Sequence, residues 1–146
     1  MTNRAATEDK DFVKAFEAFE ISASDFDHRS HIRMAYTYLC DHDVETTCRR
    51  VRDVLCRFLK LIGVEPASKY HETMTRAWTL AVCHFMVSTP DTRSAAEFID
   101  ANPKLLDKTI MMMHYSNDVM FSNAARRAFV EPDLVPIPRY DASATR

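Results

Sequence analysis

The stretch DVETTCRRVRDVLCRFLKLIG, residues 43–63, decides the fold class. Its apolar side chains recur every three or four residues, a spacing that places them on one face of an α-helix. They are Val44, Cys48, Val51, Leu55, Phe58, Leu59 and Ile62. Asp43 is suited to cap the start of this helix, and Gly63 stands where a helix commonly ends in a left-handed conformation. The stretch therefore predicts one long amphipathic helix.

Similar patterns predict further helices on both sides of this one. We expect them at about residues 10–20, from Ser22 or Ser24 to about 40, from Ser68 to about 88, from Ser94 onward, at 104–115 and at 122–130. The segment after residue 130 has three prolines in seven residues, so it is not helical. We expect it to form an extended strap in which Leu134, Val135 and Ile137 lie over the helices.

A single glycine in 146 residues is the most informative count in the composition. Phosphate-binding loops and tight β-hairpins need glycine where φ is positive, so nucleotide-binding α/β folds are disfavoured. The sequence thus predicts an all-α fold, a single-domain helical bundle of five to seven helices with an extended Pro-rich C-terminal strap. The domain is expected to span residues 1–146, with loose termini at 1–9 and 141–146.

The charge balance and the cysteines limit the function classes. Nineteen basic and twenty-one acidic residues give a net charge of −2, whereas nucleic-acid binders usually carry a basic excess. No apolar run approaches the ~20 residues that span a membrane, and the first residues do not read as a signal peptide. We therefore expect no nucleic-acid partner, no membrane partner and a cytoplasmic location with reduced cysteines. The oligomeric state stays open.

Three histidines are the candidate metal ligands: His28, His31 and His71. His28 and His31 lie three residues apart, on one face of the helix that they begin. Short connections make consecutive helices antiparallel, so the helices that begin near His28 and near His71 start at the same end of the bundle. A helix N-terminus disfavours protonated imidazole, and neutral imidazole is the form that binds metals. The sequence therefore predicts a divalent metal site, for zinc or iron.

The candidate catalytic residues are Glu72, Arg76 and Tyr115. Glu72 is expected to act as a fourth ligand or a general base. Arg76 is one turn beyond Glu72, and an ion pair between them is the favoured interpretation; the other is that Arg76, or Arg33, binds a substrate carboxylate. Tyr115 and His114 reach the histidines only if their helix ends there.

Three stretches carry a resemblance to a known family: FDHRSHIRMAYTYL, YHETMTRAW and MFSNAARRAFVEPDLVPIP, in this order. They resemble an uncharacterised family of small helical bacterial and fungal proteins with the motifs F-x-H-x-x-H, Y-H-E-T-x-T and F-S-x-x-A-R followed by P-D-L. The resemblance covers residues 12–138. It implies one intact domain and assigns no catalytic role to any residue.

The predicted function is that of a metal-dependent enzyme acting on a small-molecule substrate, with the metal as Lewis acid or as the centre of oxygen chemistry. A noncatalytic helical module that binds a small molecule or a protein, with the histidines as polar groups of its pocket, is the alternative. A metal-free acid–base enzyme is the third interpretation.

Overall fold

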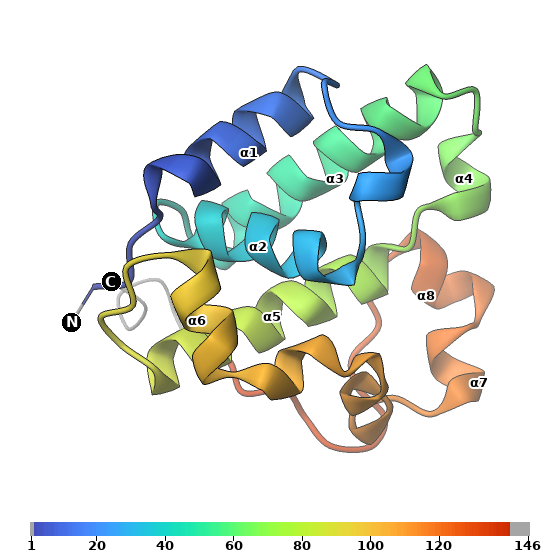
Figure 1. The fold of residues 1–146 in the computed structure, drawn as a ribbon. Helices are drawn as coiled ribbons and strands as arrows, with labels where there is room; N and C mark the ends of the chain where they lie inside the picture. Colours follow the sequence, from blue (N-terminus) through green and yellow to red (C-terminus); the bar gives the residue numbers. More distant parts are fainter. Residues whose placement is uncertain (1, 141–146) are drawn as a thin grey trace.

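The structure, a computed structural model, describes residues 2–140; all of its regular secondary structure is helical, with no β-strand in that range (Figure 1). The all-α prediction is therefore confirmed. The α-helices are α1 (Thr7–Glu17), α2 (His28–Leu39), α3 (Val44–Leu61), α4 (Pro66–Lys69), α5 (Glu72–Ser88), α6 (Ala95–Ala101), α7 (Asn117–Met120) and α8 (Asn123–Arg127). Short 3-10 helices are η1 (Ala23–Asp25), η2 (Pro103–Leu106) and η3 (Lys108–Met113). None of these helices is both long and apolar enough to cross a membrane.

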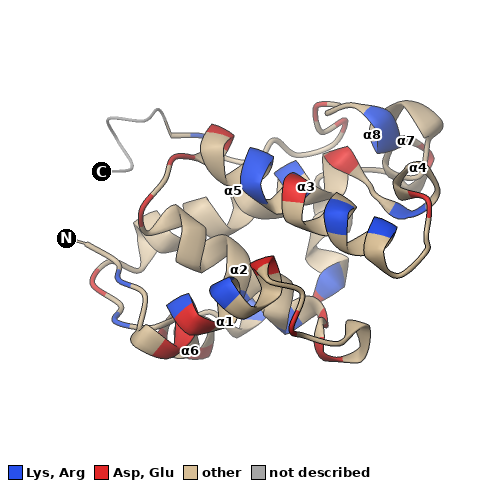
Figure 2. Cartoon of the chain, turned by 90° about the horizontal axis from the view of Figure 1, so that it is seen from above, with Lys and Arg blue, Asp and Glu red and all other residues tan. Residues whose placement is uncertain are grey.

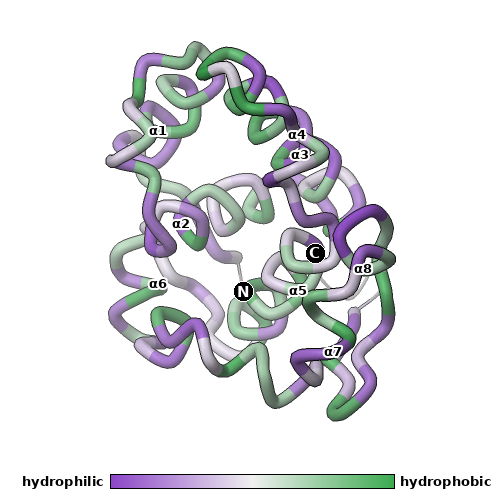
Figure 3. Tube along the Cα trace, turned by 90° about the vertical axis from the view of Figure 1, so that its right-hand side faces the viewer, coloured by the Kyte–Doolittle hydropathy of each residue, from purple (hydrophilic) through white to green (hydrophobic). Residues whose placement is uncertain are grey.

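Helix α5 is the central element of the fold. It packs against α2, α3 and α8, while α1 and α6 cover other faces of α2. The side view in Figure 3 places α5 between these three neighbours. Apolar residues of α5 accordingly occur on more than one face, and Leu80, Ala81, Val82 and Cys83 are all buried. A helix that is apolar on several sides is suited to the interior of a bundle.

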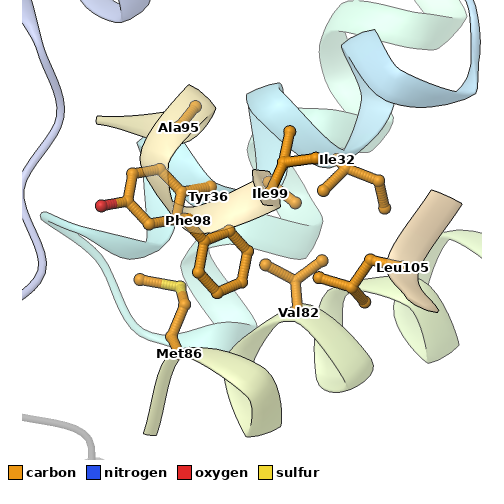
Figure 4. Close-up of a cluster of buried hydrophobic side chains, with 9 residues drawn as sticks. Ile32, Tyr36, Val82, Met86, Ala95, Phe98, Ile99 and Leu105 are labelled. Atoms are coloured by element: carbon orange, nitrogen blue, oxygen red, sulfur yellow. The ribbon is translucent and has the colours of Figure 1, made fainter. Parts of the chain in front are cut away.

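The buried side chains form three clusters around α2 and α5. In the first, the rings of Tyr36 in α2 and Phe98 in α6 stack with centroids 4.7 Å apart. Val82 and Leu105 belong to the same cluster (Figure 4). A second cluster joins α1, α2 and α3 through residues that include Phe16, Met34, Val51 and Phe58. The third joins α5 to the C-terminal part of the chain through Ala77, Leu80, Met111, Tyr115, Met120 and Ile137.

Asp9 ties three helices together from a buried position, with only 3% of its surface exposed. One carboxylate oxygen accepts a hydrogen bond from Arg33 Nε at 2.9 Å. The other accepts from the backbone N–H groups of Ala6, at 3.0 Å, and of Ala95, at 2.9 Å. The Asp9 side chain thus links α1 to α2 and to the start of α6. Arg33, a candidate for binding a substrate carboxylate, is paired with this carboxylate of the protein itself.

The long helix predicted from residues 43–63 forms as α3. The Asp43 side chain accepts a hydrogen bond from Thr46 N at 2.8 Å, and Gly63 has φ +82°. The cap predicted at Ser94 is also present, because its hydroxyl accepts from Glu97 N at 3.0 Å.

Other boundaries differ from the prediction. Helix α2 begins at His28 with Asp27 as its cap, and α5 begins after His71 instead of after Ser68. Residues 104–115 form two 3-10 pieces, since the Asp107 side chain accepts from the backbone and hydroxyl of Thr109 and so starts a new turn. The predicted helix at 122–130 is also shorter, and the short helix α7 precedes it.

Contacts are present at both ends of the described chain, where loose termini and a strap were expected. Arg4 N donates to Thr92 O at 2.8 Å, and the side chain of Asn3 bonds to Met86 and Thr92, so this part of residues 1–9 is held in place. In the expected strap only Ile137 is buried, whereas Leu134 and Val135 are each 52% exposed. Residues 1 and 141–146 lie outside the described residues, so the prediction made for them is not tested.

Candidate functional site

A cavity of about 800 Å³ lies among α2, α3, α5, η3 and α7. Its walls are mainly apolar, and they come from segments far apart in the sequence. The apolar lining residues are Ala23, Phe26, Ile32, Ala35, Val51, Leu55, Phe58, Leu59, Ile62, Met74, Trp78, Met111, Met112, Met120 and Phe121. A space of this size, walled in this way, is typical of sites that bind small organic molecules.

All three predicted histidines line this one cavity. His28 is the first residue of α2, His31 lies one turn further on, and His71 is the N-terminal cap of α5. Helices α2 and α5 therefore begin beside the same cavity, as the short connections between helices indicated. The three rings have different partners, so they differ in what they can do.

His71 is held by the backbone at both ring nitrogens. Its Nδ1 accepts a hydrogen bond from Met74 N at 3.1 Å, and its Nε2 donates to the carbonyl oxygen of Met120 at 2.7 Å. Since a carbonyl oxygen can only accept, this pair of bonds defines a neutral imidazole with its proton on Nε2. The ring therefore positions α5 against α7 and presents no spare nitrogen to the cavity.

His28 is held at one nitrogen. Its Nε2 donates to the carbonyl oxygen of Leu105 at 2.8 Å, and its ring meets the ring of Trp78 edge-on, with centroids 4.6 Å apart. This bond ties the start of α2 to η2. Its Nδ1 makes no hydrogen bond with residues 2–140.

Of the three histidines at the cavity, His31 is the one whose ring makes no hydrogen bond within the described part of the chain. It packs on Phe26, with ring centroids 3.9 Å apart. Although His31 keeps solvent contact, its pKa is lowered from 6.5 to about 4: desolvation by the surrounding protein is the main cause, the electrostatic effect of His28 adds to it, and Asp27 opposes it. At neutral pH the ring is uncharged, and its nitrogens can donate and accept hydrogen bonds to a molecule in the cavity.

The predicted metal site gains no support from this arrangement. Across residues 2–140, no three His, Cys, Asp or Glu side chains are grouped in a way that could hold a metal ion. Ligation by His71 would require it to lose a backbone hydrogen bond at the start of α5 or at Met120. The metal site stays a prediction.

Glu72 and Arg76 point away from the main cavity. The Glu72 carboxylate accepts from the Tyr70 hydroxyl at 2.8 Å and lies 3.7 Å from Arg52 Nη1, beside a smaller cavity of about 450 Å³. Arg76 pairs with Glu45 of α3 at 2.7 Å, so the ion pair predicted between Arg76 and Glu72 is wrong. The cause is tertiary, since α3 packs directly against α5 and brings Glu45 within reach.

Tyr115 and His114 also lie apart from the cavity walls. Tyr115 is fully buried, its hydroxyl donates to Val130 O at 2.6 Å, and burial raises its pKa to about 12. His114 Nδ1 donates to Val135 O at 2.6 Å at an exposed position. Both residues hold the C-terminal segment onto the bundle.

Sequence reasoning missed the cavity itself and two lysines that line it, Lys69 and Lys108. A cavity depends on the spacing between packed helices, which periodicity does not report. The run of methionines at 111–113 was the one signal available, since methionine suits adaptable ligand pockets. Met111 and Met112 do line the cavity.

No protein-family model matches the chain, and neither a curated protein nor a solved structure matches it. The predicted family resemblance therefore stays a prediction. The cavity and the residues around it are the features that bear on function.

Proposed function

We propose that the protein binds a small molecule with a largely apolar body in the main cavity. The observation that carries this proposal is the cavity of about 800 Å³, walled by aromatic, aliphatic and methionine side chains. Apolar surface moved from water into such a space is stabilised by roughly 25 cal/mol per Å². His31, with His28 beside it, supplies the polar groups that orient the ligand.

The properties of His31 favour binding over acid–base catalysis. A general base works best when its pKa lies near the working pH. The pKa of His31 is lowered to about 4, so its imidazole is a weak base at neutral pH. It is better suited to hydrogen bonding a neutral group of the ligand. Glu72, which was predicted to be a fourth ligand or a base, contacts Tyr70 and Arg52 and does not line the cavity.

Trp78 gives this proposal a direct test. It is the single tryptophan of the chain, and it lines the cavity. N-phenyl-1-naphthylamine, a neutral apolar probe that accepts energy from tryptophan, should bind in a ratio near one to one and quench Trp78 emission. Thr75→Phe places a ring into the cavity and should weaken this binding by about tenfold or more, equivalent to about 1.4 kcal/mol.

Thr46→Phe is the matched control, because Thr46 lies on α3 and does not line the cavity. Circular dichroism establishes that both variants are folded. A native protein that binds no probe, or equal binding by Thr75→Phe and the wild type, would overturn the proposal.

A metal-dependent enzyme is the second candidate, favoured by the meeting of His28, His31 and His71 at one cavity. Zinc or ferrous iron would be held by the histidines and would polarise a bound substrate. Metal analysis of protein purified without chelator tests this candidate, together with thermal unfolding in the presence of each metal. Stoichiometric metal that is lost in His28→Ala/His31→Ala supports it, and a folded, metal-free wild type argues against it.

A further inference from the structure

Two lysines mark where the main cavity meets solvent. Lys69 is the last residue of α4 and Lys108 the first of η3; both line the cavity and both side chains are exposed. Neither makes an ion pair with another described residue. By contrast, the acidic and basic residues of α1 and α3 lie side by side on those helices (Figure 2).

The helix ends beside the cavity add positive potential. Helices α2 and α5 both begin there, and a helix N-terminus carries a partial positive charge. At α5 the cap is the neutral imidazole of His71, and the carboxylate of Glu72 is turned toward Tyr70 and Arg52. Asp27 is the only acid among the described lining residues, and it is bonded to Ser30 N as the cap of α2.

The interior of the cavity suits a flexible hydrocarbon chain. Residues from α3, α5 and η3 face one another there, and they include Leu55, Phe58, Leu59, Met74, Met111 and Met112. Methionine side chains adapt to irregular apolar shapes. The exposed Ile62 and Phe121 extend the apolar lining outward to the surface.

Given the proposed binding function, on which this inference rests, we infer that the ligand is a single-chain amphiphile with an anionic head group. The apolar chain lies among the residues of α3, α5 and η3. The carboxylate or phosphate head lies near Lys69 and Lys108, where lysine charge and the helix N-termini both favour an anion.

Chains of equal length and different head group test this inference on the full-length protein. Dodecanoate, dodecyl phosphate, dodecanol and dodecylammonium are each titrated against the protein, below the concentration at which they form micelles. Displacement of N-phenyl-1-naphthylamine reports the affinity. Both anionic chains should bind about tenfold or more tighter than dodecanol and dodecylammonium, and this preference should shrink with added salt. The difference between the two anions identifies the preferred head.

The double variant Lys69→Met/Lys108→Met keeps unbranched side chains that are one heavy atom shorter and removes their charge. It should lower the affinity for dodecanoate to that for dodecanol, without changing the affinity for dodecanol. Lys60→Met/Lys104→Met is the matched control: both lysines are exposed, neither lines the cavity, and the change in net charge is the same.

The outcomes separate this inference from the proposed function. If all four chains displace the probe equally, or if the Lys69→Met/Lys108→Met variant binds dodecanoate as the wild type does, the anionic head group is overturned and binding in the cavity stands. If the neutral probe binds and no dodecyl chain displaces it, the amphiphile is overturned. If nothing binds, including the probe, the proposed function itself fails.

Discussion

His71 donates a hydrogen bond from Nε2 to the carbonyl oxygen of Met120, at 2.7 Å and 49 residues further along the chain. Its other ring nitrogen accepts from Met74 N and so caps α5. One side chain thereby fixes where the central helix begins and where α7 ends. His71, which was expected to hold a metal ion, links α5 to α7 by hydrogen bonds, and both helices border the cavity.

We predict that His71→Ala lowers the free energy of unfolding by about 2 kcal/mol, because a cap and a tertiary hydrogen bond are lost together. His71→Asn should lose less, since asparagine can still cap the helix. Urea denaturation measures both. His42→Ala is the control, because the His42 ring makes no hydrogen bond with residues 2–140; its centroid lies 6.3 Å from that of the Tyr38 ring. Equal stability of His71→Ala and the wild type would contradict this prediction.

Replacing Asp9 should weaken the junction of α1, α2 and α6. Asp9→Ala leaves the Arg33 guanidinium and the N–H groups of Ala6 and Ala95 without their acceptor. We expect a loss of about 3 kcal/mol, since a buried charge partner is removed together with its hydrogen bonds. Thermal or urea unfolding is the measurement. Asp11→Ala, exposed on the same helix, should change stability little, and a similar loss there would show that the effect is not specific to Asp9.

His31 should make the protein less stable as the pH falls. In the unfolded chain its pKa is near the ordinary 6.5, whereas in the folded protein the pKa is about 4. Between these values the unfolded state binds the extra proton, so stability decreases from about pH 6.5 to about pH 4. The loss is at most about 3 kcal/mol, and solvent contact of the ring reduces it.

Because carboxylates also titrate in this range, the test is the difference between two pH profiles. His31→Phe keeps the ring packed on Phe26 and removes the titrating group. Its stability should fall less than that of the wild type between pH 6.5 and 4, while Asp27 and His28 remain as neighbours in both proteins. Parallel profiles would refute the assignment.

The variant Tyr115→Phe tests whether the Tyr115 hydroxyl stabilises the fold or takes part in the candidate site. The hydroxyl donates to Val130 O in a fully buried position, so its removal should reduce stability by about 1–2 kcal/mol. Tyr115 does not line the cavity, so binding of N-phenyl-1-naphthylamine at a temperature where the variant is folded should stay unchanged. A selective loss of probe binding with unchanged stability would place Tyr115 in the site after all.

Local sequence signals were enough where a helix carries its own caps and one apolar face. Helix α3 has Asp43 at its start and Gly63 after its end, and it forms as predicted. The meeting of the helix starts at His28 and His71 was also foreseeable, because short connections restrict topology. Residues 104–130 were predicted poorly: Asp107 divides the helix expected at 104–115, Ser116 caps the unexpected short helix α7, and the helix that Ser122 caps ends at Arg127.

The site was only partly foreseeable for a physical reason. Residue type, spacing and topology indicated that three histidines lie at the same end of the bundle, and all three line the cavity. Their hydrogen-bond partners are backbone carbonyls 49 and 77 residues away, which no local pattern specifies. The partners of Arg33 and Arg76 likewise come from helices packed against their own. Lys69 and Lys108 lie in α4 and η3, helices too short for apolar periodicity to be informative.

The attachment of Asn3 to Thr92 bears on the order in which the chain folds. These residues are 89 positions apart, so their bond closes a long loop, and the entropy lost in closing a loop grows with its length. Contacts within α2, α3 and α5 form at much shorter separations and are expected to come first. The N-terminal segment is then expected to dock after the main folding step. Removing its contacts would speed unfolding while leaving the rate of folding nearly unchanged.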